Sequence, residues 1–313
     1  MKNIIYYHTE PQSLQSKIIQ GFMGLIKMSK IIEKKIINNS FPKEAARIPK
    51  SIQKENNVRI IHQSNRKIWE LTGKNTSSDL IILYLHGGGY FANITIQHWQ
   101  LVEQLLKNTN AKIFIPDYPL APDSNCLDVY EFTENLYSKI ISNNPNKRTA
   151  FIGDSAGCGL ALGFAQTIKN KAIKQPEEII LLSPWLDASM IHPELEVHEK
   201  NDKILTIKGL KHAGEDYAGN IAIKDPHVSP LYGSFNGLGK ISVFTGTNDL
   251  LISDARRCKE LLETQGSNFN YFEYPHMFHD WILIKGLKEA KSAIEKVSHI
   301  LNKSGSNKDL QTI

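Results

Sequence analysis

The chain has 313 residues, of which 41% are hydrophobic and 22% charged, which is typical of a globular protein with one large α/β domain or two small ones. The formal charge of +5 comes from scattered lysines without interleaved aromatic residues, so no nucleic-acid partner is expected. Three distant cysteines, Cys126, Cys158 and Cys258, argue against a disulfide framework and against clustered metal ligands. We find neither a signal-peptide pattern nor an apolar run of about 18 residues, which predicts a cytoplasmic protein without stable membrane insertion.

The N-terminal part of the chain is predicted to be helical. Residues 13–37 carry apolar side chains at helical spacing, with lysines at the intervening positions, which indicates one amphipathic helix or two. We expect the apolar face to pack on the protein's own core, and a helix that docks on a membrane or on another protein is the alternative. Two strands, at 58–62 and 67–71, are predicted to follow.

From residue 80 onward the predicted strands and helices alternate. We expect strands at 80–85, 112–116, 149–152, 178–182, 241–245 and 269–274, and helices at 96–106, 127–141, 156–168, 254–264 and 282–301. This alternation is typical of an α/β fold with a mostly parallel central sheet flanked by helices. It is interrupted between Asp187 and Ser229, and so long an insertion favours a lid or a binding element.

One turn between a predicted strand and a helix carries a candidate nucleophile. In Gly153-Asp154-Ser155-Ala156-Gly157 the outer glycines allow a tight turn that would hold Ser155 in a strained conformation with its hydroxyl exposed. A serine that merely caps the following helix is the ordinary alternative. A nucleophilic role therefore requires a base, an acid and an oxyanion site elsewhere in the chain.

Candidates for the base and the acid follow two other predicted strands. Asp249 follows the strand at 241–245, and His279 follows the strand at 269–274. Functional groups collect at the carboxyl ends of parallel strands, and the chain order Ser, Asp, His is that of an α/β-hydrolase. Asp254 competes with Asp249, but it is better explained as an acidic residue in the first turn of a helix. His276 competes with His279.

Several motifs together resemble the hormone-sensitive-lipase-like family of α/β-hydrolases, in its bacterial carboxylesterase branch. They are His86-Gly87-Gly88-Gly89, Asp117-Tyr118-Pro119-Leu120-Ala121-Pro122, Gly153-Asp154-Ser155-Ala156-Gly157, Ser183-Pro184, Ser229-Pro230-Leu231 and the pair Asp249 and His279. The resemblance runs from about residue 80 to 285 and implies an α/β-hydrolase fold. It also implies a catalytic domain at 51–313, with a helical cap built from residues 1–50 and from an insertion at about 187–228.

The resemblance assigns the catalytic residues. Ser155 is the expected nucleophile, His279 the base and Asp249 the carboxylate that orients the base, and the family's Met-x-His pattern favours His279 over His276. An imidazole suits the task of taking the serine proton, because its ordinary pKa lies near the working pH. The carboxylate holds the imidazole in the required tautomer and stabilises its cation.

Further residues are assigned by the same resemblance. The backbone N–H groups of Gly88, Gly89 and Ala156 are expected to form the oxyanion hole. His86, His98, Asp117, Tyr118 and Asp154 are expected to support the site, and Cys158 to be a small buried side chain. Tyr90, Phe91 and Trp185 lie beside these motifs and are predicted to line the substrate pocket, with a place in the core as the alternative. Phe22, Met23 and Met28 are candidates for the roof of the pocket.

These residues predict a serine carboxylesterase that uses neither a metal nor an organic cofactor. We expect short- to medium-chain acyl esters as substrates. An amidase or deacetylase with the same triad is the alternative within the enzyme class, and a non-catalytic ligand receptor on the same fold is the alternative outside it. The sequence leaves the oligomeric state open, with a homodimer as one arrangement.

Overall fold

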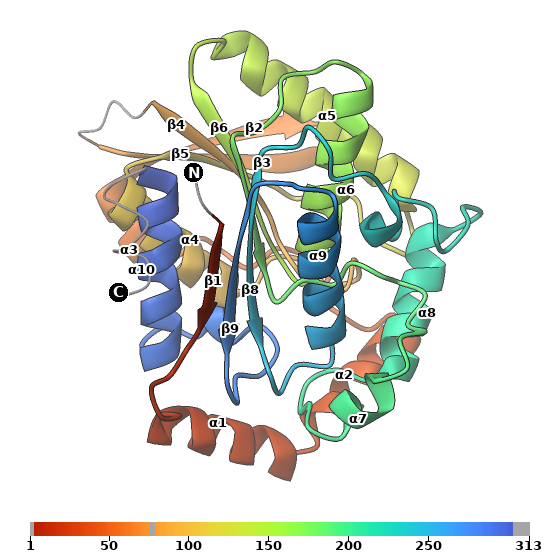
Figure 1. Ribbon diagram of the computed structural model, residues 1–313. Coiled ribbons are helices and arrows are strands. Elements are labelled where there is room, and N and C mark those ends of the chain that lie inside the picture. Colours follow the sequence, from red (N-terminus) through yellow and green to blue (C-terminus); the bar gives the residue numbers. More distant parts are fainter. Residues whose placement is uncertain (1–2, 75–78, 303–313) are drawn as a thin grey trace.

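A computed structural model describes residues 3–74 and 79–302 and places one large sheet at the centre of the molecule (Figure 1). In the described residues the sheet has nine strands in the order β1-β9-β8-β7-β6-β4-β5-β3-β2. The strands are β1 (Ile4–Tyr7), β2 (Asn56–Gln63), β3 (Arg66–Gly73), β4 (Leu80–Leu85), β5 (Lys112–Pro116), β6 (Arg148–Asp154), β7 (Glu178–Leu182), β8 (Lys240–Gly246) and β9 (Phe269–Tyr274).

The central strands are parallel and buried on both faces. Among the described strands, only the pairs β2–β3 and β3–β5 are antiparallel. Every residue of β4 is buried, with Ile81 and Leu83 in the core on one face of the sheet and Ile82 and Tyr84 in the core on the other. Such doubly covered strands appear in the sequence as continuous apolar runs, which is why their positions were predictable.

Helices cover both faces of the sheet. One core includes side chains from α5 (Cys126–Asn143), α6 (Ala156–Asn170), α8 (Ile207–Ala218) and α9 (Ile252–Thr264). The other includes side chains from α3 (Lys50–Glu55), α4 (Ile96–Thr109) and α10 (Lys288–Asn302). Figure 1 shows the two sets on opposite sides of the sheet, so the prediction of an α/β fold with a flanked parallel sheet is confirmed.

Two parts of the chain meet beyond one end of the sheet. The N-terminal helices are α1 (Leu14–Leu25) and α2 (Met28–Ile37), and α2 packs against α8 of the insertion. Figure 1 shows α1, α2 and α7 (Leu195–Glu199) at the bottom and α8 at the right. Ile36 of α2 and Leu210 of α8 belong to the same core. None of the described helices is long and apolar enough to span a bilayer.

The structure corrects the prediction that residues 1–50 are a helical cap segment. Residues 4–7 form β1, which pairs in parallel with β9 at the edge of the sheet. A strand of four residues at the edge of a sheet is too short to show a recognisable pattern of apolar and polar residues. The helix α3, which has six residues, escapes sequence-based prediction for the same reason. The remaining division into a cap and a catalytic domain stays a prediction, and its outer ends, residues 1–2 and 303–313, lie outside the described residues.

Candidate active site

Ser155 lies at a sharp turn between β6 and α6. Its φ of 50° and ψ of −120° are unusual for a residue with a side chain, and its N–H donates to the carbonyl of Leu182 at 2.9 Å. A side chain at Gly153 would collide with the carbonyl of Gly157, and one at Gly157 with the carbonyl of Leu85. The two glycines therefore allow the close packing that holds this turn.

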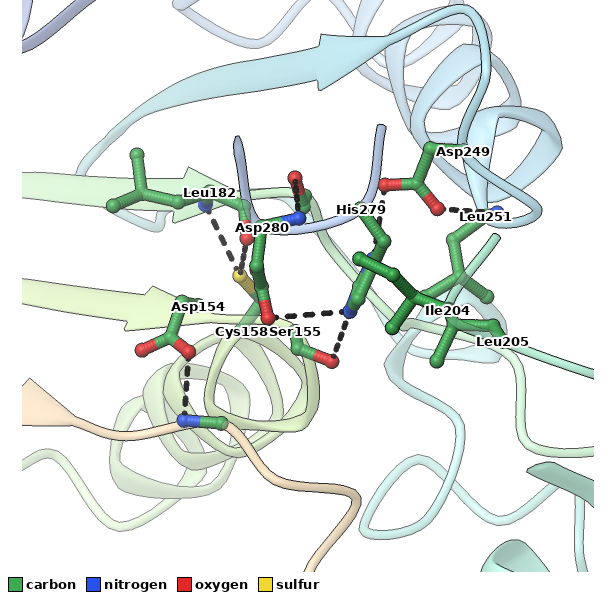
Figure 2. A network of polar contacts seen from close by, with 12 residues as sticks. Asp154, Ser155, Cys158, Leu182, Ile204, Leu205, Asp249, Leu251, His279 and Asp280 are labelled. Atoms are coloured by element: carbon green, nitrogen blue, oxygen red, sulfur yellow. Dashed lines mark hydrogen bonds and ion pairs between the residues drawn. The ribbon is translucent and has the colours of Figure 1, made fainter. Parts of the chain in front are cut away.

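The structure brings the three residues of the predicted triad together (Figure 2). Nε2 of His279 lies 2.8 Å from Oγ of Ser155, and Nδ1 lies 3.0 Å from Oδ2 of Asp249. Both distances are within hydrogen-bonding range. All three side chains are buried, although Ser155 and His279 line a cavity. The arrangement allows the imidazole to accept the hydroxyl proton while the carboxylate accepts the N–H on the other side of the ring.

A second carboxylate lies next to the imidazole. Oδ2 of Asp280 is 3.3 Å from Nε2 of His279, the same nitrogen that faces Ser155. Burial alone would lower the pKa of His279, but the negative charges of Asp249 and Asp280 outweigh it and raise that pKa well above its usual 6.5. Burial in turn raises the pKa of Asp280. In the sequence, the only signal for Asp280 is its place next to His279.

The glycine loop that follows β4 approaches the nucleophile. Gly88 and Gly89 line the same cavity as Ser155, and Ala156 is the first residue of α6. The φ values of Gly88 and Gly89 are 108° and 62°, in the region that favours glycine, and a Cβ on Gly88 would lie 2.7 Å from the carbonyl oxygen of Ala92. Bare backbone at these positions suits an oxyanion-binding role.

Buried polar groups hold this loop in place. Asp154 accepts hydrogen bonds from the N–H of Gly87 at 3.0 Å and from the hydroxyl of Tyr84 at 2.5 Å, and Nε2 of His98 lies 3.2 Å away. His86 stacks on the ring of Tyr118, with 4.3 Å between ring centroids. These contacts agree with the supporting roles predicted for Asp154, His86, His98 and Tyr118.

The two competing residues, Asp254 and His276, take no part in the hydrogen bonds that join Asp249, His279 and Ser155. The carboxylate of Asp254 accepts from the N–H groups of Leu186 and Asp187 at 2.8 and 2.9 Å, and burial raises its pKa to about 7. His276 is exposed to solvent.

The thiol of Cys158 is fully buried and donates to the carbonyls of Gly153 and Leu182, as expected of a structural side chain.

A cavity of about 310 Å³ opens beside Ser155. Its walls come from the N-terminal helices, the glycine loop, the insertion and the segment around His279. The lining residues are Met23, Met28, Ile32, Ile36, Phe41, Gly88, Gly89, Ala92, Thr95, Gln97, His98, Ser155, Ile204, Leu205, Leu210, Phe278, His279, Asp280, Leu283 and Ile284. Most are apolar, as in sites that bind small organic molecules.

The structure corrects the predicted pocket residues. Tyr90, Phe91 and Trp185 do not line this cavity, since all three belong to the buried core. The ring of Tyr90 stacks on that of Tyr217 in α8, with 3.5 Å between centroids, so these aromatic residues pack against the insertion. Of the predicted roof residues, Met23 and Met28 line the cavity, whereas Phe22 is exposed.

Asp202 connects the insertion to the loop that carries Asp249. Its carboxylate accepts from the N–H groups of Ile204 and Leu205 at 2.6 and 2.9 Å, and from that of Leu250 at 2.7 Å. Burial, together with the nearby charge of Asp249, raises the pKa of Asp202 to about 6. Ile204 and Leu205 line the cavity, so one buried side chain fixes both a cavity wall and the acid loop.

Gln20 of α1 connects the two loops that carry Asp249 and His279. Its Nε2 donates to the carbonyl of His276 at 2.9 Å, and its Oε1 accepts from Nδ2 of Asn248 at 3.0 Å. The side chain is only 8% exposed. No sequence motif points to Gln20 or Asp202, because their contacts join segments that are distant in the chain.

Among the described residues, no group of three or more His, Cys, Asp or Glu side chains could hold a metal ion.

Comparisons with known proteins agree with this architecture. A family model described as the alpha/beta hydrolase fold matches residues 82–283. A triacylglycerol lipase of Mycobacterium tuberculosis is 32% identical over 65% of this chain, and an esterase of Acinetobacter venetianus is 28% identical over 71% of it. The matches span 42% and 74% of those two proteins, so this chain matches less than half of the lipase's length.

The solved structure of a hormone-sensitive lipase from a metagenome library superposes with a TM-score of 0.80 at 20% identity. The alignment covers 94% of this chain and 99% of that one. Such a likeness at low identity establishes a common fold.

Proposed function

This chain belongs to the α/β-hydrolase family, and from that premise we propose that it is a serine carboxylesterase whose acyl-enzyme forms on Ser155. The observation that carries the proposal is the continuous contact from Asp249 through His279 to Ser155 beside the glycine loop. The substrate is a small-molecule ester that enters the apolar cavity.

The proposed reaction proceeds in two halves. Nε2 of His279 accepts the proton of Ser155 as Oγ attacks the ester carbonyl, and Asp249 stabilises the resulting imidazolium. The oxyanion of the tetrahedral intermediate accepts hydrogen bonds from the N–H groups of Gly88, Gly89 and Ala156. The intermediate then collapses, and the alcohol leaves with the proton from His279. Water, deprotonated by His279, attacks the acyl-enzyme, and the carboxylic acid is released as Ser155 recovers its proton.

The cavity supports short to medium acyl chains. Its volume of about 310 Å³ is at the lower end of the usual range for small-molecule sites. Met23, Met28 and Leu205 belong to an apolar part of its wall, which suits the hydrocarbon of an acyl chain. An amidase or deacetylase would use the same triad. Comparing the rates of ester and amide hydrolysis distinguishes such an enzyme from a carboxylesterase.

Two further properties belong to the proposal. A cytoplasmic location is supported by the three cysteines, which are free and buried. A homodimer remains a prediction that sedimentation would test.

The test is hydrolysis of p-nitrophenyl esters with two to twelve carbons in the acyl chain, with the matching anilides measured at equal concentration. We expect ester hydrolysis to peak at short or medium chains and to disappear in Ser155→Ala. Ser253→Ala is the matched control, since the Ser253 hydroxyl is buried without a hydrogen-bond partner among the described residues. Full activity of Ser155→Ala would contradict the proposal, and faster anilide cleavage would favour the amidase.

A further inference from the structure

Four large apolar side chains of α1 are exposed in one row. Leu14, Ile18, Phe22 and Leu25 are 73%, 62%, 59% and 80% exposed. Their spacing of four, four and three residues places them on the same face of the helix. Single exposed apolar residues are common on protein surfaces, but a contiguous row of this size marks a surface that binds something. We call these four residues the α1 face.

The segment that carries the α1 face has an excess of positive charge. Residues 13–37 contain five lysines and one acidic residue, Glu33. Lys17 lies in α1, Lys27 lies between the two helices, and Lys30, Lys34 and Lys35 lie in α2, which packs against α1; all five are exposed. The insertion adds Lys203, whose side chain reaches the surface of α1 beside Gly24. A helix with an outward apolar row, next to a second helix rich in lysine, is suited to the interface of an anionic bilayer.

We propose that the α1 face docks reversibly on an anionic phospholipid surface, with α1 lying along the interface. The apolar row would enter the boundary between headgroups and acyl chains, and the lysines would contact lipid phosphates. The charge argues against a second copy of this chain as the occupant. A two-fold contact between α1 faces would bring two groups of lysines together, which is unfavourable.

The same helices connect the docking surface to the cavity. Met23 of α1 and Met28 of α2 line the cavity beside Ser155, while Leu14, Ile18, Phe22 and Leu25 face solvent. Docking would therefore hold the cavity next to the lipid, so that esters dissolved in the bilayer could reach it over a short path. The proposed docking does not depend on esterase activity, because it needs only the exposed row and the lysines.

The test is co-sedimentation of the full-length protein with vesicles of ether-linked lipids, which carry no ester bond for the cavity to bind. One set contains phosphatidylcholine and phosphatidylglycerol at three to one, and the other contains phosphatidylcholine alone. The test variant is Ile18→Gln/Leu25→Gln, which keeps helix-forming residues in α1. The matched control is Ile60→Thr/Leu127→Gln, which removes two apolar side chains exposed by 49% and 48% in β2 and α5.

We expect the native protein and the control to bind anionic vesicles, and the test variant to bind roughly tenfold more weakly or worse. Binding to phosphatidylcholine alone should be weaker, and salt should reduce binding to anionic vesicles. All forms should hydrolyse a water-soluble ester equally, which shows that they are folded. The proposal is overturned if the native protein binds neither vesicle, or if the test variant binds as well as the control. A native dimer that the test variant dissociates would also overturn it and assign the α1 face to a second copy.

Discussion

The carboxylate of Asp280 lies 3.3 Å from Nε2 of His279, the nitrogen that is also 2.8 Å from the hydroxyl of Ser155. The imidazole is thus placed between two carboxylates, with Asp249 at Nδ1 and Asp280 at Nε2 (Figure 2). Only the unprotonated Nε2 can accept the serine proton. Asp280 therefore stabilises the imidazolium that forms during the reaction. It also raises the pKa of His279 in the free enzyme, so that the imidazole is protonated at a higher pH.

The first prediction concerns the pH dependence of hydrolysis. Because both carboxylates raise the pKa of His279, kcat/KM should fall on the acid side at a pH above the usual 6.5. In Asp280→Asn one negative charge is lost, the pKa of His279 falls, and the acid limb should move to lower pH. The measurement is kcat/KM against pH for a neutral ester, with Asp123→Asn as an exposed control. An unmoved acid limb would show that Asp280 does not act on His279.

The second prediction separates the two acids that compete in the sequence. Asp249→Asn should lower kcat by about 10⁴, as expected when the orienting carboxylate of a triad is lost. Asp254→Asn should retain most of the activity, because its carboxylate contacts backbone N–H groups and not the imidazole. Steady-state kinetics and circular dichroism of both variants test this. A large loss of kcat in Asp254→Asn alone would reverse the assignment.

The third prediction concerns the glycine loop. Gly88→Ala should lower kcat by about 10²–10³, because a methyl group at this positive φ would press on the carbonyl of Ala92 and displace the oxyanion donors. Gly21→Ala is the control, since nothing lies within 4 Å of its Cβ position in α1. That change should keep kcat and raise the free energy of unfolding by about 0.5–1 kcal/mol. If Gly88→Ala and Gly21→Ala had the same kcat, Gly88 would not contribute to the oxyanion site.

The fourth prediction tests Asp202. Asp202→Ala leaves the N–H groups of Ile204, Leu205 and Leu250 without their acceptor, which should cost about 1–3 kcal/mol of unfolding free energy for each group that stays buried. It should also lower kcat, because the loop that carries Asp249 loses its anchor. Asp202→Asn keeps one acceptor oxygen and should recover part of both losses. Chemical denaturation and kinetics measure them, and an unchanged kcat in a destabilised Asp202→Ala would limit Asp202 to stability.

Much of the fold and the triad could be predicted from the sequence because each depends on local patterns. The apolar runs of the doubly buried strands and the glycines around Ser155 are properties of neighbouring residues. Asp249 and His279 could be found because each directly follows a strand of the sheet. The prediction of the α/β-hydrolase family is confirmed by the match at 82–283.

The remaining features depend on contacts that no local pattern encodes. Tyr90, Phe91 and Trp185 lie next to motif residues in the chain, but their side chains enter the core under α8 and leave the cavity wall to other residues. β1 finds its partner β9 more than 260 residues away, where Ile4 pairs with Asn270. The contacts of Gln20 and Asp202 are of the same long-range kind, so only the folded chain reveals them.

The position of Gln20 has a practical consequence for how this protein is produced. A single amide in the second turn of α1 joins the backbone of His276 to the side chain of Asn248, so the placement of the acid and base loops depends on a helix that begins at Leu14. Removing α1 from an expressed chain would break both hydrogen bonds and should lower turnover even though every triad residue remained intact.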